Sequence, residues 1–448
     1  MARTVVEALP RQVDLRALHR QQPDRYPFLL ESTAIGPELG RFDILFAFPG
    51  EELVLEQFAA LDGPGSESAT NFFDALDAWW QKERRDESDS PLPFLGGWFM
   101  YLGYELAAHV EPSLNLEPDT ILPTAFAVRC PAALITEHSS EQTFVVCEHE
   151  QDNLVIEIRD DVDSMDNDAV PDERIKVIVD EEKPDYFLQA VRHAKAHVSA
   201  GDIYQANLSR AWHATVGDDV TASAIYEHLC AANPAPFAGK VNWRGKSIIS
   251  SSPERLISVR NGEASTRPIA GTRPRGADDD ADSALSEELF GHPKERAEHV
   301  MLIDLERNDL GRVCEPGSVE VSEYMVLESY AHVHHIVSNV RGRLLDGITP
   351  GDAIRAVFPG GTITGCPKVR CMEIISELEQ GPRGAYTGSF GYLNRSGSLD
   401  LNILIRTMVK DGNKLELRAG SGIVADSDPE SELAETRAKA KGLLMALA

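Results

Sequence analysis

Positive charge is scarce in this chain of 448 residues: 43 Lys and Arg stand against 72 Asp and Glu, a formal net charge of −29. Binding to phosphate backbones or to acidic membrane surfaces needs net or clustered positive charge, so we expect neither nucleic acid nor a membrane as a partner. No run approaches the ~20 apolar residues of a membrane-spanning helix. The first residues, MARTVVEALPRQVDL, lack the apolar stretch of a signal peptide, and we expect a cytoplasmic protein.

Cysteines are also few and scattered. The closest pair of the six, Cys366 and Cys371, has the spacing of neither a zinc site nor a redox motif. We therefore expect reduced, mostly buried thiols, as in proteins of a reducing compartment.

The composition itself is globular, with 42% hydrophobic and 26% charged residues. The length allows two or three ordinary domains or one large interleaved domain. Helix-like and strand-like segments show no regular βαβ alternation, which predicts an α+β fold with large, mainly antiparallel sheets. The expected strands are 42–48, 143–149, 247–250 and 402–409, and the expected helices are 185–201 (with Gly201 as C-cap), 293–307 and 367–379.

An acidic stretch divides the sequence into two regions. Residues 151–184 are poor in large apolar side chains, apart from two short strand-like runs. We interpret them as a partly mobile connector between an N-terminal region, 1–150, and a C-terminal region, 185–448. A second acidic run, ADDDADS (277–283), is expected to be a solvated loop.

Four glutamates fall on two predicted helices, one beginning at Pro293 and the other at Pro429. Spacings of three residues place each pair on one helical face. If the pairs converge, they form an oxygen-only site for a hard cation, for which Mg²⁺ is the natural choice. The alternative is two solvated helix faces, which are ordinary in so acidic a chain. The pairs are Glu295 with Glu298 and Glu432 with Glu435.

The second half also carries a series of long motifs. They are RPIAGTRPRG (267–276), AEHVMLIDLERNDLGRV (297–313), HVHHIVSNVRG (332–342), FPGGTITGCPKVRCMEII (358–375), AYTGSFGY (385–392), LNILIRT (401–407) and AGSGIVADSDPESELAETRAKA (419–440). Together they resemble the chorismate-utilising enzymes, which include anthranilate synthase component I, aminodeoxychorismate synthase component I, isochorismate synthases and salicylate synthases. The resemblance begins near Asp185 and implies an α/β sandwich with chorismate and magnesium in a deep cleft.

The resemblance implies roles for the glutamates and for several substrate-binding residues. Glu298 and Glu435 match direct magnesium ligands, with Glu295 and Glu432 nearby or bound through water. Arg406 and Tyr386 match residues that hold a substrate carboxylate. The remaining substrate-binding positions are the glycine-rich turn Gly420, Ser421 and Gly422, which receives the enolpyruvyl carboxylate on bare backbone N–H groups, together with Lys439, Gly365 and Thr362.

The resemblance also assigns the groups that carry the chemistry. These enzymes displace the C4 hydroxyl of chorismate, which needs a general acid because hydroxide leaves poorly. Glu254 in SSSPER (250–255) matches that acid, with an exposed turn glutamate as the alternative. His335 matches the active-site histidine, with a structural histidine as its alternative, and His332 and His334 are interpreted as structural.

The residue at position 205, Gln205, indicates which nucleophile the enzyme uses. Family members that use water carry a lysine base at this position, and a neutral amide cannot deprotonate water. The substitution favours ammonia as the nucleophile, and it argues against isochorismate or salicylate synthesis.

Position 270 separates the two aminating branches. Many aminodeoxychorismate synthases have a lysine there, proposed to attack the ring covalently, whereas anthranilate synthases have alanine; Ala270 cannot be a nucleophile. The length and five other stretches resemble aminodeoxychorismate synthase component I. We therefore expect 4-amino-4-deoxychorismate as product, for the folate pathway, with anthranilate as the alternative. The five stretches are 40–53, 92–112, 200–214, 235–243 and 249–259.

Partners follow from the same resemblance. No cysteine lies in a glycine-flanked nucleophile elbow, so ammonia is expected from a separate glutamine amidotransferase subunit. The segment LLES (29–32) resembles one that helps bind tryptophan in this family, or is merely a strand end. A non-catalytic scaffold is a further alternative, which the intact set of acidic and basic site residues disfavours.

Overall fold

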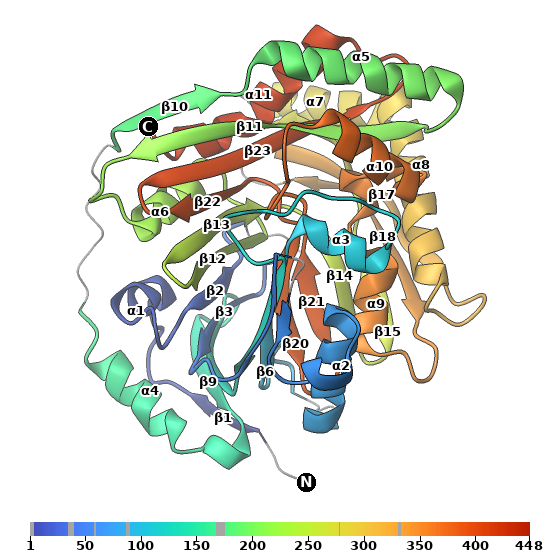
Figure 1. Cartoon of the computed structure of the whole chain (residues 1–448). Coiled ribbons are helices and arrows are strands. Elements are labelled where there is room, and N and C mark those ends of the chain that lie inside the picture. Colours follow the sequence, from blue (N-terminus) through green and yellow to red (C-terminus); the bar gives the residue numbers. More distant parts are fainter. Residues whose placement is uncertain are drawn as a thin grey trace.

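Two large sheets face each other in the computed structural model, which describes residues 4–34, 40–57, 60–86, 90–166, 175–276, 278–329 and 333–448. Every strand pairing within them is antiparallel, for example β3 with β8 and β6 with β20. Helices cover the outer sides of the sheets (Figure 1). The predicted α+β class and the α/β sandwich are confirmed.

The first sheet contains twelve strands within the described residues and crosses the left and upper part of Figure 1. Its strands in spatial order are β1 (Val5–Ala8), β9 (Gln142–Cys147), β8 (Ala132–Glu137), β3 (Phe42–Ala47), β2 (Phe28–Glu31), β12 (Phe237–Trp243), β13 (Lys246–Ser252), β22 (Thr407–Asp411), β23 (Lys414–Ile423), β11 (Gln205–Val216) and β10 (Val177–Glu181), with β19 (Gly365–Cys366) on β11.

The second sheet contains eleven strands within the same described ranges. They are, in order, β16 (Ile269–Pro274), β18 (Val333–Arg343), β15 (Glu263–Thr266), β14 (Arg255–Arg260), β21 (Leu399–Asn402), β20 (Ser389–Asn394), β6 (Gly97–Leu102), β7 (Ala125–Cys130), β4 (Glu52–Glu56) and β5 (Ala60–Asp62), with β17 (Glu320–Ser329) on β18.

Alternation along the strands builds an inner and an outer core. On β6, Phe99 and Tyr101 point between the sheets, whereas Trp98, Met100 and Leu102 pack on the outer side. This period of two is what a strand buried on both faces requires. Aromatic rings join the sheets: Phe28 stacks on Phe99 with ring centroids 4.2 Å apart, and Phe126 stacks on Trp243 at 3.8 Å.

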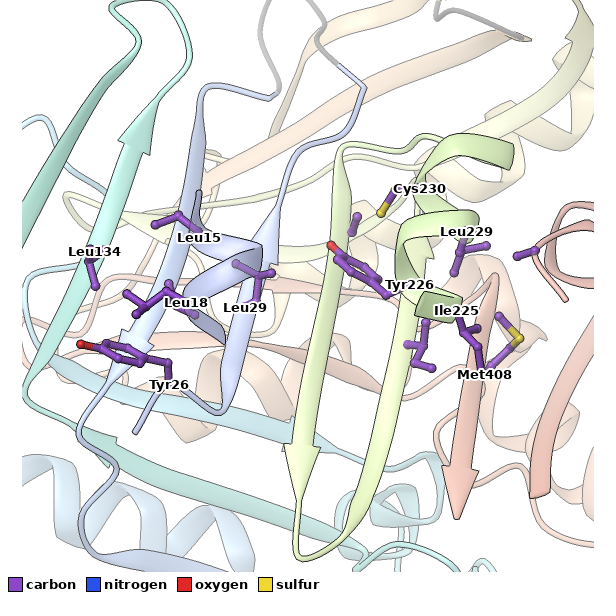
Figure 2. Close-up of a cluster of buried hydrophobic side chains, with 14 of the residues drawn as sticks. Leu15, Leu18, Tyr26, Leu29, Leu134, Ile225, Tyr226, Leu229, Cys230 and Met408 are labelled. Carbon is purple, nitrogen blue, oxygen red and sulfur yellow. The ribbon is translucent and has the colours of Figure 1, made fainter. Parts of the chain in front are cut away.

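The outer layers are helical. Over the first sheet, α1 (Leu15–Gln21), α4 (Leu154–Asp163) and α6 (Ala222–Ala232) share one apolar cluster with β2 and β22, which includes Leu18, Leu29, Ile225 and Met408 (Figure 2). Over the second sheet lie α2 (Phe72–Glu83), α8 (Pro293–Gly311) and α9 (Pro350–Val357). The layers beside β11 and β23 are α5 (Pro184–Ala200), α10 (Lys368–Leu378) and α11 (Pro429–Met445).

Local signals explain the helix ends. Helix α5 ends at Gly201, which is left-handed with φ 82°, as predicted. Helix α11 begins at Pro429 behind the N-cap Asp428, whose carboxylate accepts from Ser431 N at 2.9 Å. Helix α8 begins at Pro293, as predicted.

Three local predictions are wrong. The run 277–283 is not a loop: from Asp279 it forms the first turn of α7 (Asp279–Gly291), capped by Asp278, while residue 277 is outside the described residues. The first strand-like run of the connector is helix α4, because Leu154, Val155, Ile158 and Val162 share one buried face. The strand expected over 402–409 is broken at 403–406, between β21 and β22.

Both sheets interleave the N-terminal and C-terminal regions. Strand β2 pairs with β12, and β6 pairs with β20. The six cysteines are free, and all except Cys366 are buried. Within the described ranges, none of the helices combines the length and the apolar character needed to cross a bilayer.

Candidate active site

Two glycines on β23, Gly420 and Gly422, have no side chains and so leave room for two polar groups. A Cβ on Gly420 would lie 2.7 Å from the Tyr386 hydroxyl, and a Cβ on Gly422 would lie 2.5 Å from Nε2 of Gln205. Any side chain at either glycine would therefore collide with one of these groups. Between them, Ser421 is fully buried and its Oγ has no hydrogen-bond partner among the described residues. The structure thus brings the glycine-rich turn, Tyr386 and Gln205 together.

Gln205 connects this turn to α8. Its Nε2 donates to Oε1 of Glu298 at 3.0 Å, and Gln205 is only 3% exposed. Next to it in register, Gly365 pairs with Ala206, and a Cβ at Gly365 would lie 2.1 Å from Gln205 O. Gln205 therefore orients one carboxylate oxygen of Glu298, a predicted magnesium ligand.

Lys439 approaches the same turn from α11. Its Nζ donates to Gly420 O at 3.0 Å and forms an ion pair with Oε1 of Glu435 at 2.8 Å. Both side chains are 48% exposed. Lys439 thus places a positive charge beside the glycine-rich turn, with one oxygen of Glu435 engaged.

Glu254 is buried rather than an exposed turn residue. It lies between β13 and β14 and is 5% exposed, with Oε1 lacking a hydrogen-bond partner within the described part of the chain. Burial raises the pKa of Glu254 to about 7, although the Thr362 hydroxyl, the Ile269 N–H and the charges of Arg406 and Lys439 oppose the rise. A carboxyl group with this pKa carries a proton in much of the population at neutral pH, as a general acid must.

Arg406 lies beside Glu254 on the broken segment 403–406. Its φ of 52° is left-handed, and Ser251 N donates to its carbonyl at 3.1 Å. Burial lowers the pKa of Arg406, opposed by the Glu254 charge. No hydrogen bond of its guanidinium to another described residue is formed, so the group is available to an anion.

His335 completes this side of the site. It is 2% exposed, and burial lowers its pKa to about 3, with the Arg406 charge acting in the same direction and the Gly271 backbone opposing. The imidazole is therefore neutral at pH 7. His334, by contrast, bonds Ser329 and Asp282 at 2.7 and 3.0 Å and is structural, as predicted; His332 lies outside the described residues.

The segment 267–276 contains β16 and borders the site, because the Ile269 backbone acts on Glu254 and the Gly271 backbone acts on His335. Two of its arginines hold protein carboxylates: Arg267 binds Glu323 and Glu328 on β17, and Arg275 binds Asp282 through two bonds of 2.7 Å. The side chain of Ala270 is outside the described residues, and only its backbone pairing with Ile336 is described.

Two of the four glutamates reach the glycine-rich turn from different helices, Glu298 from α8 and Glu435 from α11. Glu298 meets Gln205 beside Gly422, and Glu435 meets Lys439 beside Gly420. Glu295 lies 3.1 Å from where a Cβ on Gly271 would be, and Glu432 is 7% exposed. Among the described residues, no three acidic, histidine or cysteine side chains are close enough to form a preassembled metal site. The donors are all carboxylates, which suits a hard cation, and the buried, unpaired Oε1 of Gln205 is a further oxygen beside Glu298.

This arrangement of a buried acid, cationic groups and a glycine-rich turn can hold a small dianion and protonate its leaving group. Residues 45–445 match the family described as chorismate binding enzyme. The chain belongs to this family.

Relatives within the family carry two names. An anthranilate synthase component I-like protein from Synechocystis is 43% identical over 80% of this chain and 73% of its own length. Aminodeoxychorismate synthase component 1 from Bacillus subtilis is 40% identical over 82% of this chain and 80% of its own. The crystal structure of anthranilate synthase component I from Streptococcus pneumoniae superposes with a TM-score of 0.81 at 32% identity, covering 90% and 92% of the two chains. The comparisons support a chorismate-utilising activity and leave both products open.

Sequence reasoning missed the polar groups that support the site. Arg383 lies over the rings of Tyr104 and Tyr386, 4.8 and 5.6 Å from their centroids, and pairs with the buried carboxylate of Glu379. Burial raises the pKa of Tyr386 to about 12. The Gln205–Glu298 bond was also missed. These contacts join elements that are far apart in the chain, so no local sequence pattern predicts them.

A separate cavity of about 1160 Å³ lies between the sheets and is lined by residues of β2, β12, β20 and β21. Leu30, Glu31 and Ser32 of the LLES segment are part of its wall, whereas Glu254, Arg406 and the other predicted site residues in the described ranges are not. The carboxylate of Glu31 is engaged by Arg16 and by the Tyr226 hydroxyl at 2.7 Å. Tryptophan binding at the LLES segment stays a prediction.

Proposed function

We propose that this chain aminates chorismate with ammonia and releases 4-amino-4-deoxychorismate. The observation that carries the proposal is Glu254: a buried carboxyl group with a pKa raised to about 7, beside the cationic side chain of Arg406. Such a pair can hold an anionic substrate and at the same time donate a proton to it.

In the proposed reaction, chorismate is held through its two carboxylates. Arg406 and Tyr386 bind one, and the backbone N–H groups of Gly420–Gly422 bind the other, with Lys439 adding positive charge. Ammonia forms a C–N bond to the ring, the C4–O bond breaks, and the proton of Glu254 leaves with the oxygen as water. The Glu254 carboxylate then takes a proton from the new ammonium group, which restores the acid.

Glu298 and Glu435 are the residues we propose to hold magnesium, which would neutralise charge on the bound substrate. Glu298→Gln removes one formal charge with little change of shape, so turnover should fall while the fold stays intact. The assay is chorismate consumption with ammonium at varied magnesium, with and without chelator. Wild-type activity of Glu298→Gln at limiting magnesium would remove Glu298 from the metal site.

Gln205 supports ammonia as the nucleophile, because its amide donates to Glu298 and has no basicity with which to activate water. We further propose that a separate glutamine amidotransferase supplies this ammonia. The isolated chain should then act with ammonium salts at raised pH, where free ammonia is more abundant, and not with glutamine.

Anthranilate is the second candidate product, favoured by Ala270. Without a lysine at this position, amination proceeds without a covalent enzyme intermediate. A 2-amino intermediate can lose pyruvate to give anthranilate. Alternatively, a second ammonia can form a bond to C4 while the C2–N bond breaks and ammonia leaves, which gives the 4-amino product. The resemblance of the N-terminal stretches supports the 4-amino product.

The deciding experiment is mass spectrometry and fluorescence of the products, with and without an added aminodeoxychorismate lyase. We expect 4-aminobenzoate only when the lyase is present. Fluorescent anthranilate and pyruvate formed without lyase would overturn the proposed product. Failure to consume chorismate under any of these conditions would instead favour a non-catalytic scaffold.

A further inference from the structure

A buried carboxylate of the N-terminal region holds a loop of the candidate site. Glu105 lies in the short helix η2 (Tyr104–Leu106) and is 3% exposed. Its Oε1 accepts from Arg383 N at 2.7 Å, and Gly384 N donates to Oε1 at 3.2 Å and to Oε2 at 3.1 Å. Beside it, Tyr104 N donates to Gly384 O at 2.9 Å. Three backbone groups of residues 383–384 are therefore held by two residues that lie far away in the chain.

No cation balances the charge of Glu105. It forms no ion pair with another described residue, and the Arg383 guanidinium pairs with Glu379 instead. Burying a carboxylate without a counter-charge lowers stability relative to an apolar side chain of similar size. Stability alone therefore does not explain a carboxylate at this position, and the contact it makes specifically is with the loop.

The loop is strained beside Tyr386. The next residue, Thr387, has a φ of 63°, which is unfavourable for a β-branched side chain, and Gly384 has a φ of 58°. A small cavity of about 20 Å³ borders the loop at Gly384 and Tyr386, so packing does not fill all the space around it. Strained backbone persists only where its surroundings restrain it. The hydrogen bonds from Glu105 supply such a restraint.

The backbone of residues 383–386 in turn fixes the ring of Tyr386. Tyr386 N donates to Arg383 O at 3.0 Å, and the Arg383 guanidinium lies 5.6 Å from the ring centroid. At the far end of the ring, the hydroxyl lies 2.7 Å from where a Cβ on Gly420 would be. A shift of the backbone at residues 383–384 therefore moves this hydroxyl relative to the glycine-rich turn.

We propose that Glu105 is a positioning residue, which holds the loop 383–388 through its backbone N–H groups and so places the Tyr386 hydroxyl in the substrate site. This inference rests on the proposed role of Tyr386 in binding a substrate carboxylate. Glu105 itself touches neither the substrate nor the reacting atoms.

The test is the kinetics of chorismate consumption in Glu105→Gln. The amide keeps the shape of the side chain but replaces one acceptor oxygen with an NH₂ donor, which cannot accept from Gly384 N. The KM for chorismate should rise about tenfold, the effect of losing one hydrogen bond to a charged group. The kcat should change little, because Glu254 and Arg406 are untouched. An unchanged KM would overturn the proposal.

A matched control separates positioning from a general loss of stability. Asp77 on α2 likewise joins the two regions of the chain, since its carboxylate accepts from Gly351 N at 2.8 Å and from the Thr349 hydroxyl at 2.6 Å. Asp77→Asn should lower stability and leave the KM for chorismate unchanged. If Glu105→Gln does not fold, Glu105→Asp replaces it. Its carboxylate is withdrawn by one methylene group, so the KM should again rise, and an unchanged KM would again overturn the proposal.

A double-mutant cycle shows whether Glu105 acts through Tyr386. Tyr386→Phe alone removes the hydroxyl and should also raise the KM about tenfold. If Glu105 only positions this hydroxyl, adding Glu105→Gln to Tyr386→Phe should raise the KM no further. Increases that multiply in the double variant would contradict the proposal.

Hydrogen exchange gives a readout that does not depend on activity. In folded Glu105→Gln, the amide hydrogens of residues 383 and 384 should exchange faster than in wild type, whereas Asp77→Asn should leave them unchanged. Unchanged exchange in Glu105→Gln overturns the inference whether or not the protein is active. Faster exchange in a protein that consumes no chorismate retains the held loop and refutes only the proposed function.

Discussion

Glu254 and Glu379 are both buried carboxyl groups, yet their surroundings give them opposite properties. The side chain of Glu379 is 3% exposed and accepts from Arg383 at 2.6 Å, from Arg418 at 3.2 Å and from the backbone of Ser209 at 2.7 Å. Burial alone would raise its pKa, but the two arginines and these hydrogen bonds hold the pKa below the usual value. Glu254 feels the charges of Arg406 and Lys439 but forms an ion pair with neither within the described residues, and one of its oxygens is unpaired, so its pKa rises. A carboxylate that is fully paired serves the fold, whereas one left partly unpaired is available for proton transfer.

The largest effect should come from the unpaired acid. Glu254→Gln keeps the shape of the side chain and removes the transferable proton, so the rate of chorismate consumption should fall by about 10²–10⁴-fold. Thermal unfolding should be unchanged or shifted upward, because a buried ionisable group is lost. Activity within a few-fold of wild type would end the assignment of Glu254 as the general acid.

Breaking the paired acid should act on stability instead. Glu379→Gln leaves Arg383 and Arg418 buried without a counter-charge, which we expect to cost about 3–5 kcal/mol in the free energy of unfolding. Urea denaturation measures this. Glu137→Gln is the control, since its partner Arg41 is 56% exposed and such surface pairs contribute about 1 kcal/mol or less. If Glu379→Gln lowers the free energy of unfolding by as little as the control does, the ion pairs of Glu379 with Arg383 and Arg418 do not stabilise the fold.

The pH dependence of stability sharpens the contrast. Folded Glu254 keeps its proton up to a pKa of about 7, whereas the unfolded chain releases it near 4.5, so its contribution is present below pH 4.5 and is lost as pH rises through 7. Between pH 5 and 9, the stability of Glu254→Gln should therefore gain about 2 kcal/mol relative to wild type. The difference between Glu379→Gln and wild type should stay constant over this range, because the lowered pKa of Glu379 places its titration below it. If the free energy of unfolding depends on pH in the same way for Glu254→Gln and wild type, the raised pKa of Glu254 is contradicted.

The smallest effect concerns Gln205, whose amide orients Glu298. In Gln205→Leu the carboxylate loses this bond, and the magnesium concentration that gives half-maximal activity should rise about tenfold. Saturating magnesium should restore most of the rate, because no reacting group is lost. An unchanged magnesium requirement would separate Gln205 from the metal.

The fold class was predictable because the periodicity of apolar residues and the separation of helix-like from strand-like segments can be read from the sequence. Helix 185–201 and its glycine stop were correct for this reason. Two predictions failed where composition was misleading. The acidic run after residue 277 begins a helix rather than a loop, because Asp278 is its N-cap. The apolar run 402–409 is not one continuous strand, because Arg406 has a left-handed backbone conformation.

Within the site, the motifs indicated which side chains would gather. The structure places Glu254 and His335 beside the 269–271 backbone, with the charge of Arg406 acting on both, and it places Tyr386 and Lys439 beside Gly420. The supporting partners could not be predicted. The bond from Gln205 to Glu298 and the ion pair from Lys368 to Asp309 depend on how distant elements pack, and neither spacing nor composition carries that information.

The interleaving of the sheets has a consequence for biosynthesis. Strand β6 lies between β7 and β20, and its Trp98 pairs with Leu393, which the ribosome adds only near the end of translation. Until then one edge of β6 has no partner, although its residues Phe99 and Tyr101 belong to the inner core. Such an edge can associate with other chains. The nascent protein therefore cannot complete either sheet during synthesis, and its yield should depend on how well chaperones protect the first 150 residues while the rest is made.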